Sequence, residues 1–137
     1  MERVITDTGF VVALANRLDD RHADVAPIYA QYLKILLPQV VLVEVAYLIN
    51  RDAVMTTVIK FLKGLPASRF ELLAAVEQDI ARSADILDQY IDSKIDFVDA
   101  CVMAMAERLN IQTVLTIDQR DFRLFRPTHC ESFILKP

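Results

Sequence analysis

The fold is decided by the stretch RVITDTGFVVALANR, residues 3–17. Its first part, residues 3–6, has the apolar, β-branched character of a short buried strand. From residue 9 to residue 17 the apolar side chains recur at helical spacing instead. Asp7 stands at the junction, where the strand ends and the helix begins. A strand that runs directly into a helix predicts an α/β fold.

The rest of the chain repeats this alternation. We expect further strands at residues 39–42, 70–73, 113–115 and 132–135, and further helices at residues 20–36, 43–50, 53–62, 76–90 and 96–109. Such alternation implies a central, mainly parallel sheet of four to five strands flanked by helices, in three layers. The length of 137 residues is that of one ordinary domain, so residues 1–137 are expected to form a single domain.

Composition excludes several classes of protein. Apolar residues make up 54% and charged residues 25%, which is a globular balance. The sequence contains no apolar run of the roughly 18 to 20 residues that a spanning helix requires, and no export signal, so we expect a cytoplasmic protein without a membrane segment. With Gly9 and Gly64 as the only glycines, a phosphate-binding glycine loop is excluded. The net charge of −4 argues against a domain that coats nucleic acid, although a carboxylate cluster that binds cations would also make the chain acidic.

Four acids occupy comparable positions along the chain. Each lies where an expected strand ends or an expected helix begins: Asp7, Glu44, Asp99 and Asp118. Because loops at the carboxyl ends of parallel strands converge on one edge of the sheet, we expect these carboxylates to lie close together.

Each acid taken alone also has a structural explanation. Asp7 could cap the helix that follows, and Asp118 could be a turn residue. Asp96 and Asp99 resemble a helix cap followed by a second acid in the first turn. Glu44 is harder to explain in this way, because it interrupts an otherwise apolar run, and a buried carboxylate without a partner is costly.

The joint occurrence of the four acids favours a metal site. Carboxylates this close would raise one another's pKa unless a divalent cation neutralised them. Oxygen ligands favour magnesium or manganese over zinc. Such a site can activate water for the cleavage of a phosphodiester bond, so no side-chain nucleophile is required.

Four short motifs carry a resemblance to a known family. They are Ile5-Thr6-Asp7-Thr8-Gly9, Leu42-Val43-Glu44-Val45-Ala46, Asp96-Phe97-Val98-Asp99-Ala100 and Leu115-Thr116-Ile117-Asp118-Gln119-Arg120-Asp121-Phe122. In this order and spacing, the chain resembles the PIN-domain nucleases, in particular the VapC-like toxins of bacterial toxin–antitoxin systems.

The resemblance implies a PIN-like fold and an endoribonuclease that depends on Mg²⁺ or Mn²⁺. Its acidic quartet would be Asp7, Glu44, Asp99 and Asp118, with Thr8 and Thr116 supporting the carboxylates through their hydroxyls. The implied partners are an RNA substrate, a small antitoxin protein and a second copy of the chain. A dimer face is expected on the helices at residues 20–36 and 53–62.

Other residues are given secondary roles. Asp96 is interpreted first as a helix cap and second as a residue that shares the metal. Arg51, Arg120 and Arg123 could contact RNA phosphates, although a solvated surface role is the more common one for such residues. The two histidines, His22 and His129, are expected to be surface or structural residues.

Three alternatives from other classes remain. A receiver-like signalling domain would need a pair of adjacent acids after the first strand and a lysine after the last expected strand, and a dehalogenase-type phosphatase would need Asp-x-Asp. The sequence Asp7-Thr8-Gly9 supplies neither acidic motif. A catalytically inactive PIN-like interaction module remains open.

Overall fold

The structure is a computed structural model that describes residues 2–137. Its strands are β1 (Val4–Thr6), β2 (Ile35–Pro38), β3 (Phe70–Leu73), β4 (Thr113–Leu115) and β5 (Ile134–Lys136). Its α-helices are α1 (Thr8–Ala15), α2 (His22–Gln31), α3 (Gln39–Asp52), α4 (Met55–Gly64), α5 (Glu77–Gln89), α6 (Phe97–Arg108) and α7 (Arg120–Leu124). Short 3₁₀ turns follow α4 at Leu65–Ala67 and α5 at Ile91–Ser93.

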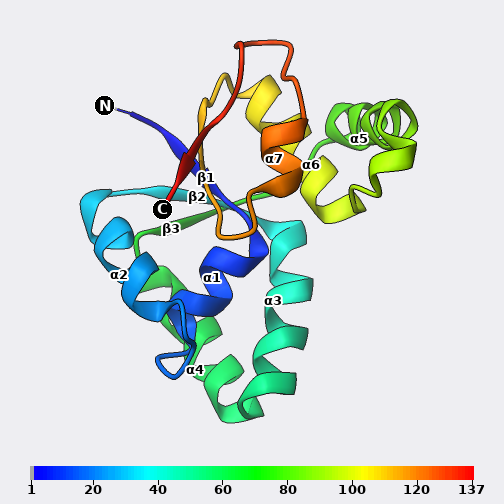
Figure 1. Ribbon diagram of the computed structural model, residues 1–137. Coiled ribbons are helices and arrows are strands. Elements are labelled where there is room, and N and C mark those ends of the chain that lie inside the picture. Colours follow the sequence, from blue (N-terminus) through cyan, green and yellow to red (C-terminus); the bar gives the residue numbers. More distant parts are fainter. Residues whose placement is uncertain (1) are drawn as a thin grey trace.

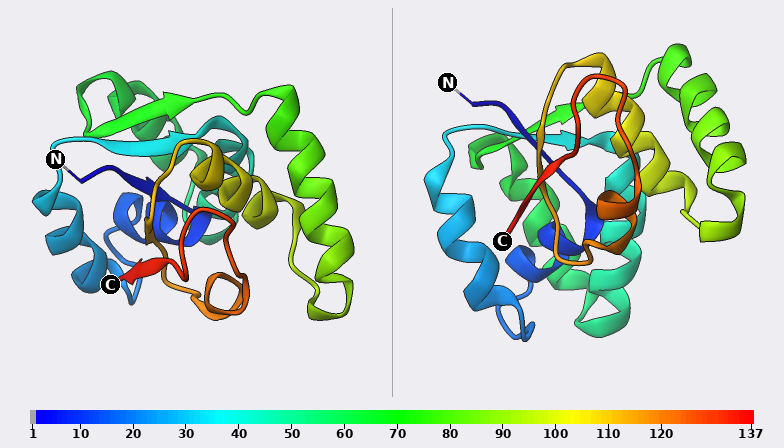
Figure 2. Two further views of the ribbon diagram at one scale, coloured as in Figure 1. Left: turned by 90° about the horizontal axis from the view of Figure 1, so that it is seen from above. Right: turned by 45° about the horizontal axis from the view of Figure 1, so that its top comes forward.

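The five strands form one parallel sheet in the order β3-β2-β1-β4-β5. Helices α1 to α4 lie on one side of this sheet and α5 to α7 on the other (Figure 1). Seen from above, α5 stands outside α6, at a distance from the strands (Figure 2, left). The predicted three-layer α/β fold with a parallel sheet is therefore confirmed.

The sheet is short and deeply buried. Every residue of β1, β2 and β4 is buried, as expected for parallel strands covered on both faces. Helix α6 has a continuous buried segment, residues 100–106, because it lies between the sheet and α5 and contacts both β1 and α5. A helix in this central position needs apolar or small side chains around its whole circumference, not on one stripe alone.

Two predicted elements near β2 are wrong. The sequence predicts a helix at residues 20–36 and a strand at residues 39–42, whereas α2 ends at Gln31, β2 spans Ile35–Pro38 and α3 begins at Gln39. The apolar residues run almost without a break through this region, so periodicity alone does not locate the boundary. The strand is defined by its pairing, from Ile35 opposite Phe70 to Pro38 opposite Leu73.

The other boundaries are closer to the prediction. The strands at residues 70–73 and 113–115 are confirmed, and the last strand lies one to two residues further on than the predicted 132–135. The sequence does not predict helix α7, because its five residues are too few to show a periodic pattern. Over residues 2–137, no helix has both the length and the apolar composition needed to span a bilayer.

Candidate active site

The candidate site lies at the carboxyl ends of β1 and β4. These two strands are neighbours in the sheet, with Thr6 paired to Leu115 at their ends. From β1 the chain crosses to β2 on one side, whereas β4 leads to β5 on the other. Ligands of open α/β sheets bind in the crevice at such a switch point. Asp7 follows β1 directly, and Thr116 follows β4, so both lie at this crevice.

Asp7 is the most enclosed of the candidate acids, with 5% of its surface exposed. It caps α1, because the backbone N–H of Phe10 donates to Asp7 Oδ1 over 3.3 Å. The hydroxyl of Thr116 donates to the other oxygen, Oδ2. The capping interpretation of Asp7 is therefore correct, and the cap together with Thr116 holds the carboxylate in a defined orientation.

The electrostatics of Asp7 differ from those of an ordinary helix cap. Burial raises its pKa from 3.8 to about 7, against the hydrogen bonds from Thr116 and Phe10, which lower it. The negative charges of Asp118 and Glu44 add to the increase. The carboxylates of Asp118 and Glu44 therefore lie close enough to Asp7 to act on its pKa.

Asp99, in the first turn of α6, belongs to the same cluster. Burial raises its pKa from 3.8 to about 8, and the negative charges of Asp96, Asp7, Asp121 and Glu44 contribute further. The backbone N–H of Asp99 donates to Asp96 Oδ1 over 2.8 Å, so Asp96 is the cap of α6, as the first interpretation predicts. Glu44 and Asp118 thus lie close enough to raise the pKa of Asp7, and Asp7 and Glu44 lie close enough to raise the pKa of Asp99.

Glu44 lies near the other acids, but on a different element from the one predicted. It does not follow a strand directly, but lies in the second turn of α3, six residues after β2 ends. Val41 and Val45 face the core, while Glu44 between them is half-buried. The expectation that Glu44 is a buried carboxylate is therefore wrong. Asp7 has that property instead.

Asp121 is an acid that sequence reasoning did not select. It lies in the first turn of α7, where burial raises its pKa, Arg120 lowers it, and the charges of Asp118 and Asp96 raise it. The signal in the sequence was its position three residues after Asp118, which is also typical of a turn. Asp121 extends the negative cluster along the start of α7.

The chemistry of these donors fits a hard divalent cation. All are carboxylate oxygens, which magnesium and manganese prefer. The hydroxyl of Thr8, next to Asp7, is buried without a hydrogen-bond partner and is a further oxygen donor at this edge. As the side chains lie, no three His, Cys, Asp or Glu residues within 2–137 already surround one point as a ligand set.

The three arginines proposed to contact RNA are exposed but engaged within the chain. Arg51 pairs with Asp52 at 2.7 Å, and Arg120 pairs with Asp121 at 2.8 Å. Arg123 donates to the side-chain oxygen of Gln119 at 2.8 Å. Of the three, Arg120 is the one whose partner, Asp121, also raises the pKa of Asp99.

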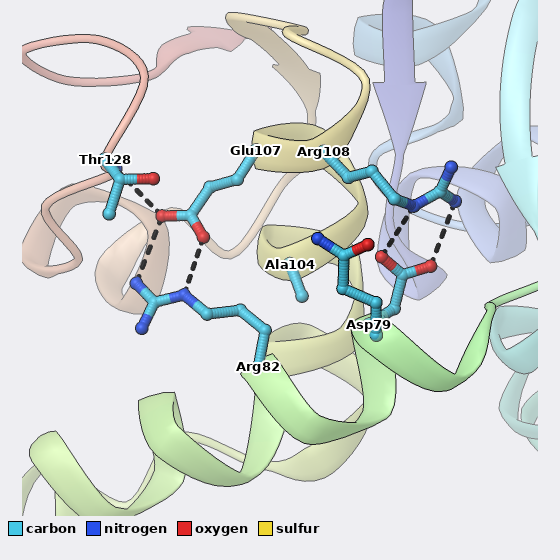
Figure 3. Close-up of a pocket in the computed structure, with 7 residues that line it drawn as sticks. Asp79, Arg82, Ala104, Glu107, Arg108 and Thr128 are labelled. Carbon is cyan, nitrogen blue, oxygen red and sulfur yellow. Dashed lines mark hydrogen bonds and ion pairs between the residues drawn. The ribbon is translucent and has the colours of Figure 1, made fainter.

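A second polar region lies between α5 and α6. It surrounds a pocket of about 420 Å³, across which two ion pairs join the helices (Figure 3). Arg108 pairs with Asp79 at 2.8 Å and Arg82 pairs with Glu107 at 2.7 Å. Each acid here has a guanidinium partner. This pocket therefore lacks the unbalanced negative charge of the acids at the carboxyl ends of β1 and β4, the region called the carboxyl edge.

Comparison with known proteins gives one family for almost the whole chain. Residues 4–126 match the PIN domain. Ribonuclease VapC26 of Mycobacterium tuberculosis is 27% identical over 135 residues, which cover 98% of this chain and all of the relative.

Solved structures agree on the fold. The Mycobacterium tuberculosis toxin VapC20, described as cleaving the sarcin–ricin loop, superposes with a TM-score of 0.78 at 20% identity, over 85% of this chain and 90% of that chain. VapBC2 from Rickettsia felis, solved with a DNA fragment from its promoter, gives a TM-score of 0.70 at 17% identity, over 97% and 96% of the two chains.

Proposed function

Since this chain belongs to the PIN domain family, we propose that it is a metal-dependent endoribonuclease that hydrolyses RNA phosphodiester bonds. One observation carries the proposal: at the carboxyl ends of β1 and β4, the buried carboxylate of Asp7 is held by Thr116 and the Phe10 N–H, and it shares this edge with Glu44, Asp99 and Asp118. Evolved folds compensate buried charge, and no ion pair within residues 2–137 involves any of these four acids. Acids grouped in a crevice without such partners indicate a functional site. The similarity to ribonuclease VapC26 supports RNA as the substrate.

The four acids would hold the cation: Asp7, Glu44, Asp99 and Asp118. Mg²⁺ or Mn²⁺ bound there would supply a water of lowered pKa and would neutralise charge on the phosphate. Asp7 and Asp99 must be ionised to act as ligands, so binding of the cation would displace protons from these carboxyl groups.

The neighbouring residues position these ligands. Thr116 donates to one oxygen of Asp7 while the Phe10 N–H binds the other, so the carboxylate cannot rotate freely. Asp96 caps α6 and thereby fixes the first turn, which carries Asp99. We assign Thr8, whose hydroxyl is buried without a partner, to the same supporting group. Outer partners of this kind orient metal ligands in many proteins.

We further propose that the protein is the toxin of a toxin–antitoxin pair, inhibited by a small antitoxin protein. The similarity to the VapC20 toxin and to the VapBC2 assembly supports this role. The proposed working form is a cytoplasmic homodimer. The exposed guanidinium groups of Arg51, Arg120 and Arg123 would exchange their present partners for RNA phosphates.

The test is cleavage of a mixed RNA pool with Mg²⁺, with Mn²⁺ and with a chelator, using the native protein, Asp7→Asn and Asp88→Asn. Asp88 is an exposed acid on α5 and serves as a matched control. We expect cleavage by the native protein and by Asp88→Asn, in the presence of metal only. Cleavage in the chelator, or native activity in Asp7→Asn, would contradict the mechanism.

A further inference from the structure

The turn from β4 to α7, residues 116–119, carries two parts of the candidate site. Its first residue, Thr116, donates its hydroxyl hydrogen to Asp7, and its third, Asp118, is one of the four predicted metal ligands. Asp118 is exposed and forms no ion pair within residues 2–137. Surface connections are more mobile than the elements they join unless other groups hold them. The residues that hold this turn therefore affect the geometry of the site.

The side chain of Gln119 holds the turn through three hydrogen bonds. Its Nε2 donates to the carbonyl oxygen of Pro137 over 2.9 Å and to that of Thr116 over 3.3 Å. Its Oε1 accepts a hydrogen bond from Arg123 over 2.8 Å. A primary amide has two N–H donors and one carbonyl oxygen, so both ends of the side chain are engaged. Two carbonyl acceptors and a guanidinium donor are compatible with only this orientation of the amide.

Gln119 also occupies a position where another residue type is usual. It is the N-cap residue of α7, but its side chain makes no capping hydrogen bond. Helix N-caps favour Asn, Asp, Ser and Thr, whose short side chains accept hydrogen bonds from the first turn of the helix. The longer amide of Gln119 is directed instead at the turn and at the end of β5.

The end of β5 is itself attached to the body of the protein. The backbone oxygen of Lys136 accepts a hydrogen bond from the Thr116 N–H over 2.7 Å. The ammonium group of Lys136 donates to the hydroxyl of Tyr32 over 2.7 Å, and Tyr32 is buried. Gln119 therefore ties the turn to a strand end that has its own attachment.

The position of the turn decides which acceptor the Thr116 hydroxyl binds. A hydroxyl has one proton to donate, and two acceptors lie within reach: Asp7 Oδ2 and the backbone oxygen of Asp118, 3.0 Å away. Thr116 and Asp118 belong to the turn, whereas Asp7 follows a different strand. If the turn shifted away from Asp7, the hydroxyl would bind Asp118 alone, and Asp7 would lose a hydrogen bond that orients it.

We propose that Gln119 is a positioning residue for the candidate metal site. Its amide holds the turn against the end of β5, so that Thr116 stays directed at Asp7 and Asp118 stays at the crevice. Gln119 acts through these residues and contacts neither the cation nor the RNA. This inference rests on the proposed function, but cation binding by the protein can be measured without RNA cleavage.

The first test is the affinity for Mn²⁺ alone, measured by titration calorimetry in the absence of RNA. Gln119→Met keeps the length of the side chain and removes all three hydrogen bonds. We expect its Kd for Mn²⁺ to rise about tenfold, at the lower end of the effect of residues that orient metal ligands. Gln112→Met is the matched control, because Gln112 is an exposed glutamine directly before β4, and it should leave Kd unchanged. An unchanged Kd in Gln119→Met would overturn the proposal.

Gln119→Asn separates positioning from stability. This variant keeps an amide, of a type favoured at helix N-caps, but it is one methylene too short to keep both carbonyl contacts. We expect a native melting temperature together with a Kd for Mn²⁺ raised roughly threefold. A native Kd in this variant would mean that the reach of the amide does not matter, and the proposal would fail. If Gln119→Met does not fold, this variant decides the question.

A double-mutant cycle tests whether Gln119 acts through Thr116. Thr116→Val should raise Kd by itself, because it removes the donor to Asp7. Gln119→Met in the Thr116→Val background should then raise Kd by less than roughly twofold more, since the hydroxyl that the turn positions is already gone. Independent effects would multiply, so a further tenfold rise would overturn the proposal. Thermal melting of each variant checks that it is folded.

RNA cleavage distinguishes the role of Gln119 from the proposed function. If Gln119→Met binds Mn²⁺ more weakly but the native protein cleaves no RNA, positioning stands and the nuclease function fails. If the native protein and Gln119→Met cleave RNA equally at Mn²⁺ concentrations below the native Kd, positioning fails and the nuclease function stands. If the native protein binds no Mn²⁺, both the metal site and the positioning role are overturned.

Discussion

Acidic residues have opposite electrostatic surroundings at the carboxyl edge of the sheet and in the contact between α5 and α6. Between α5 and α6, the carboxylate of Asp79 is almost fully buried and accepts two hydrogen bonds from Arg108. Burial would raise the pKa of Glu107, but hydrogen bonds from Arg82 and Thr128 lower it below its ordinary value. At the carboxyl edge, burial raises the pKa of Asp7 to about 7, and neighbouring acids increase it further.

This difference separates a structural acid from a candidate functional one. An acid with a guanidinium partner stabilises the fold when ionised, whereas clustered acids without cations destabilise it when ionised. The clustered acids without cationic partners lie at the edge where an α/β sheet ordinarily binds ligands. If this distinction holds, substitutions in the two regions must affect activity and stability in different ways.

The largest effect is expected for Asp99→Asn at the carboxyl edge. Loss of this charge should reduce kcat/KM for RNA cleavage by on the order of 10³-fold, more than the 10- to 100-fold typical of residues that only orient a metal ligand. The metal-free variant should melt at or above the native temperature at pH 8, because one repelling charge is gone. Kinetics and thermal melting of the same preparations measure both. A variant that loses activity together with stability would be a folding mutant, and the distinction would fail.

Asp79→Ala in the α5–α6 contact should give the reverse pattern. The substitution leaves Arg108 without its partner and removes the acceptor for the Val76 N–H, 2.9 Å away. We expect a loss of about 3 kcal/mol in the free energy of unfolding, as for other broken buried ion pairs. Urea unfolding measures this loss, and the activity per folded molecule should stay native. Asp85→Asn, which changes an exposed acid on the same helix, is the control and should leave stability within about 0.5 kcal/mol of native.

The sequence predicts these two regions to different extents. The acids of the carboxyl edge could be selected because each lies near the end of a strand or the start of a helix. The pairing of Asp79 with Arg108 could not, because the two residues lie on different helices and only the packing of α5 on α6 brings them together. The assignment of these acids as metal ligands is a prediction, and RNA cleavage by Asp7→Asn and Asp99→Asn tests it.

The misassigned elements show what the periodicity of the sequence cannot predict. Residues 35–45 form a nearly continuous apolar run, so the change from strand to helix after Pro38 leaves no periodic signal. The same error made Glu44 look like a residue that directly follows a strand, when it lies on a helix with one side exposed.

A smaller effect is expected for Thr116→Val, which keeps the shape of the side chain and removes the donor to Asp7. Cleavage should fall roughly 10- to 100-fold, with a loss of about 1 kcal/mol in stability. Because this hydrogen bond lowers the pKa of Asp7, its removal should also move the acid limb of the pH–rate profile to higher pH. Thr113→Val, which removes a hydroxyl on β4 that donates to Glu2, should leave that limb in place.

The smallest effect is the pH dependence of stability without metal. The unfolded chain releases the protons of Asp7 and Asp99 near pH 4, whereas the folded chain keeps them to about pH 7 and about pH 8. Between these limits the folded state binds more protons, so stability must fall as pH rises.

In a chelator, the melting temperature should drop by roughly 5 °C from pH 5 to pH 8, and by less in Asp99→Asn. Excess Mg²⁺ should restore it at pH 8 and do little at pH 5, because only the ionised carboxylates bind the cation. A melting temperature that rises with pH in the chelator would mean that these acids have cationic partners, as Asp79 and Glu107 do, and the contrast between the two regions would disappear.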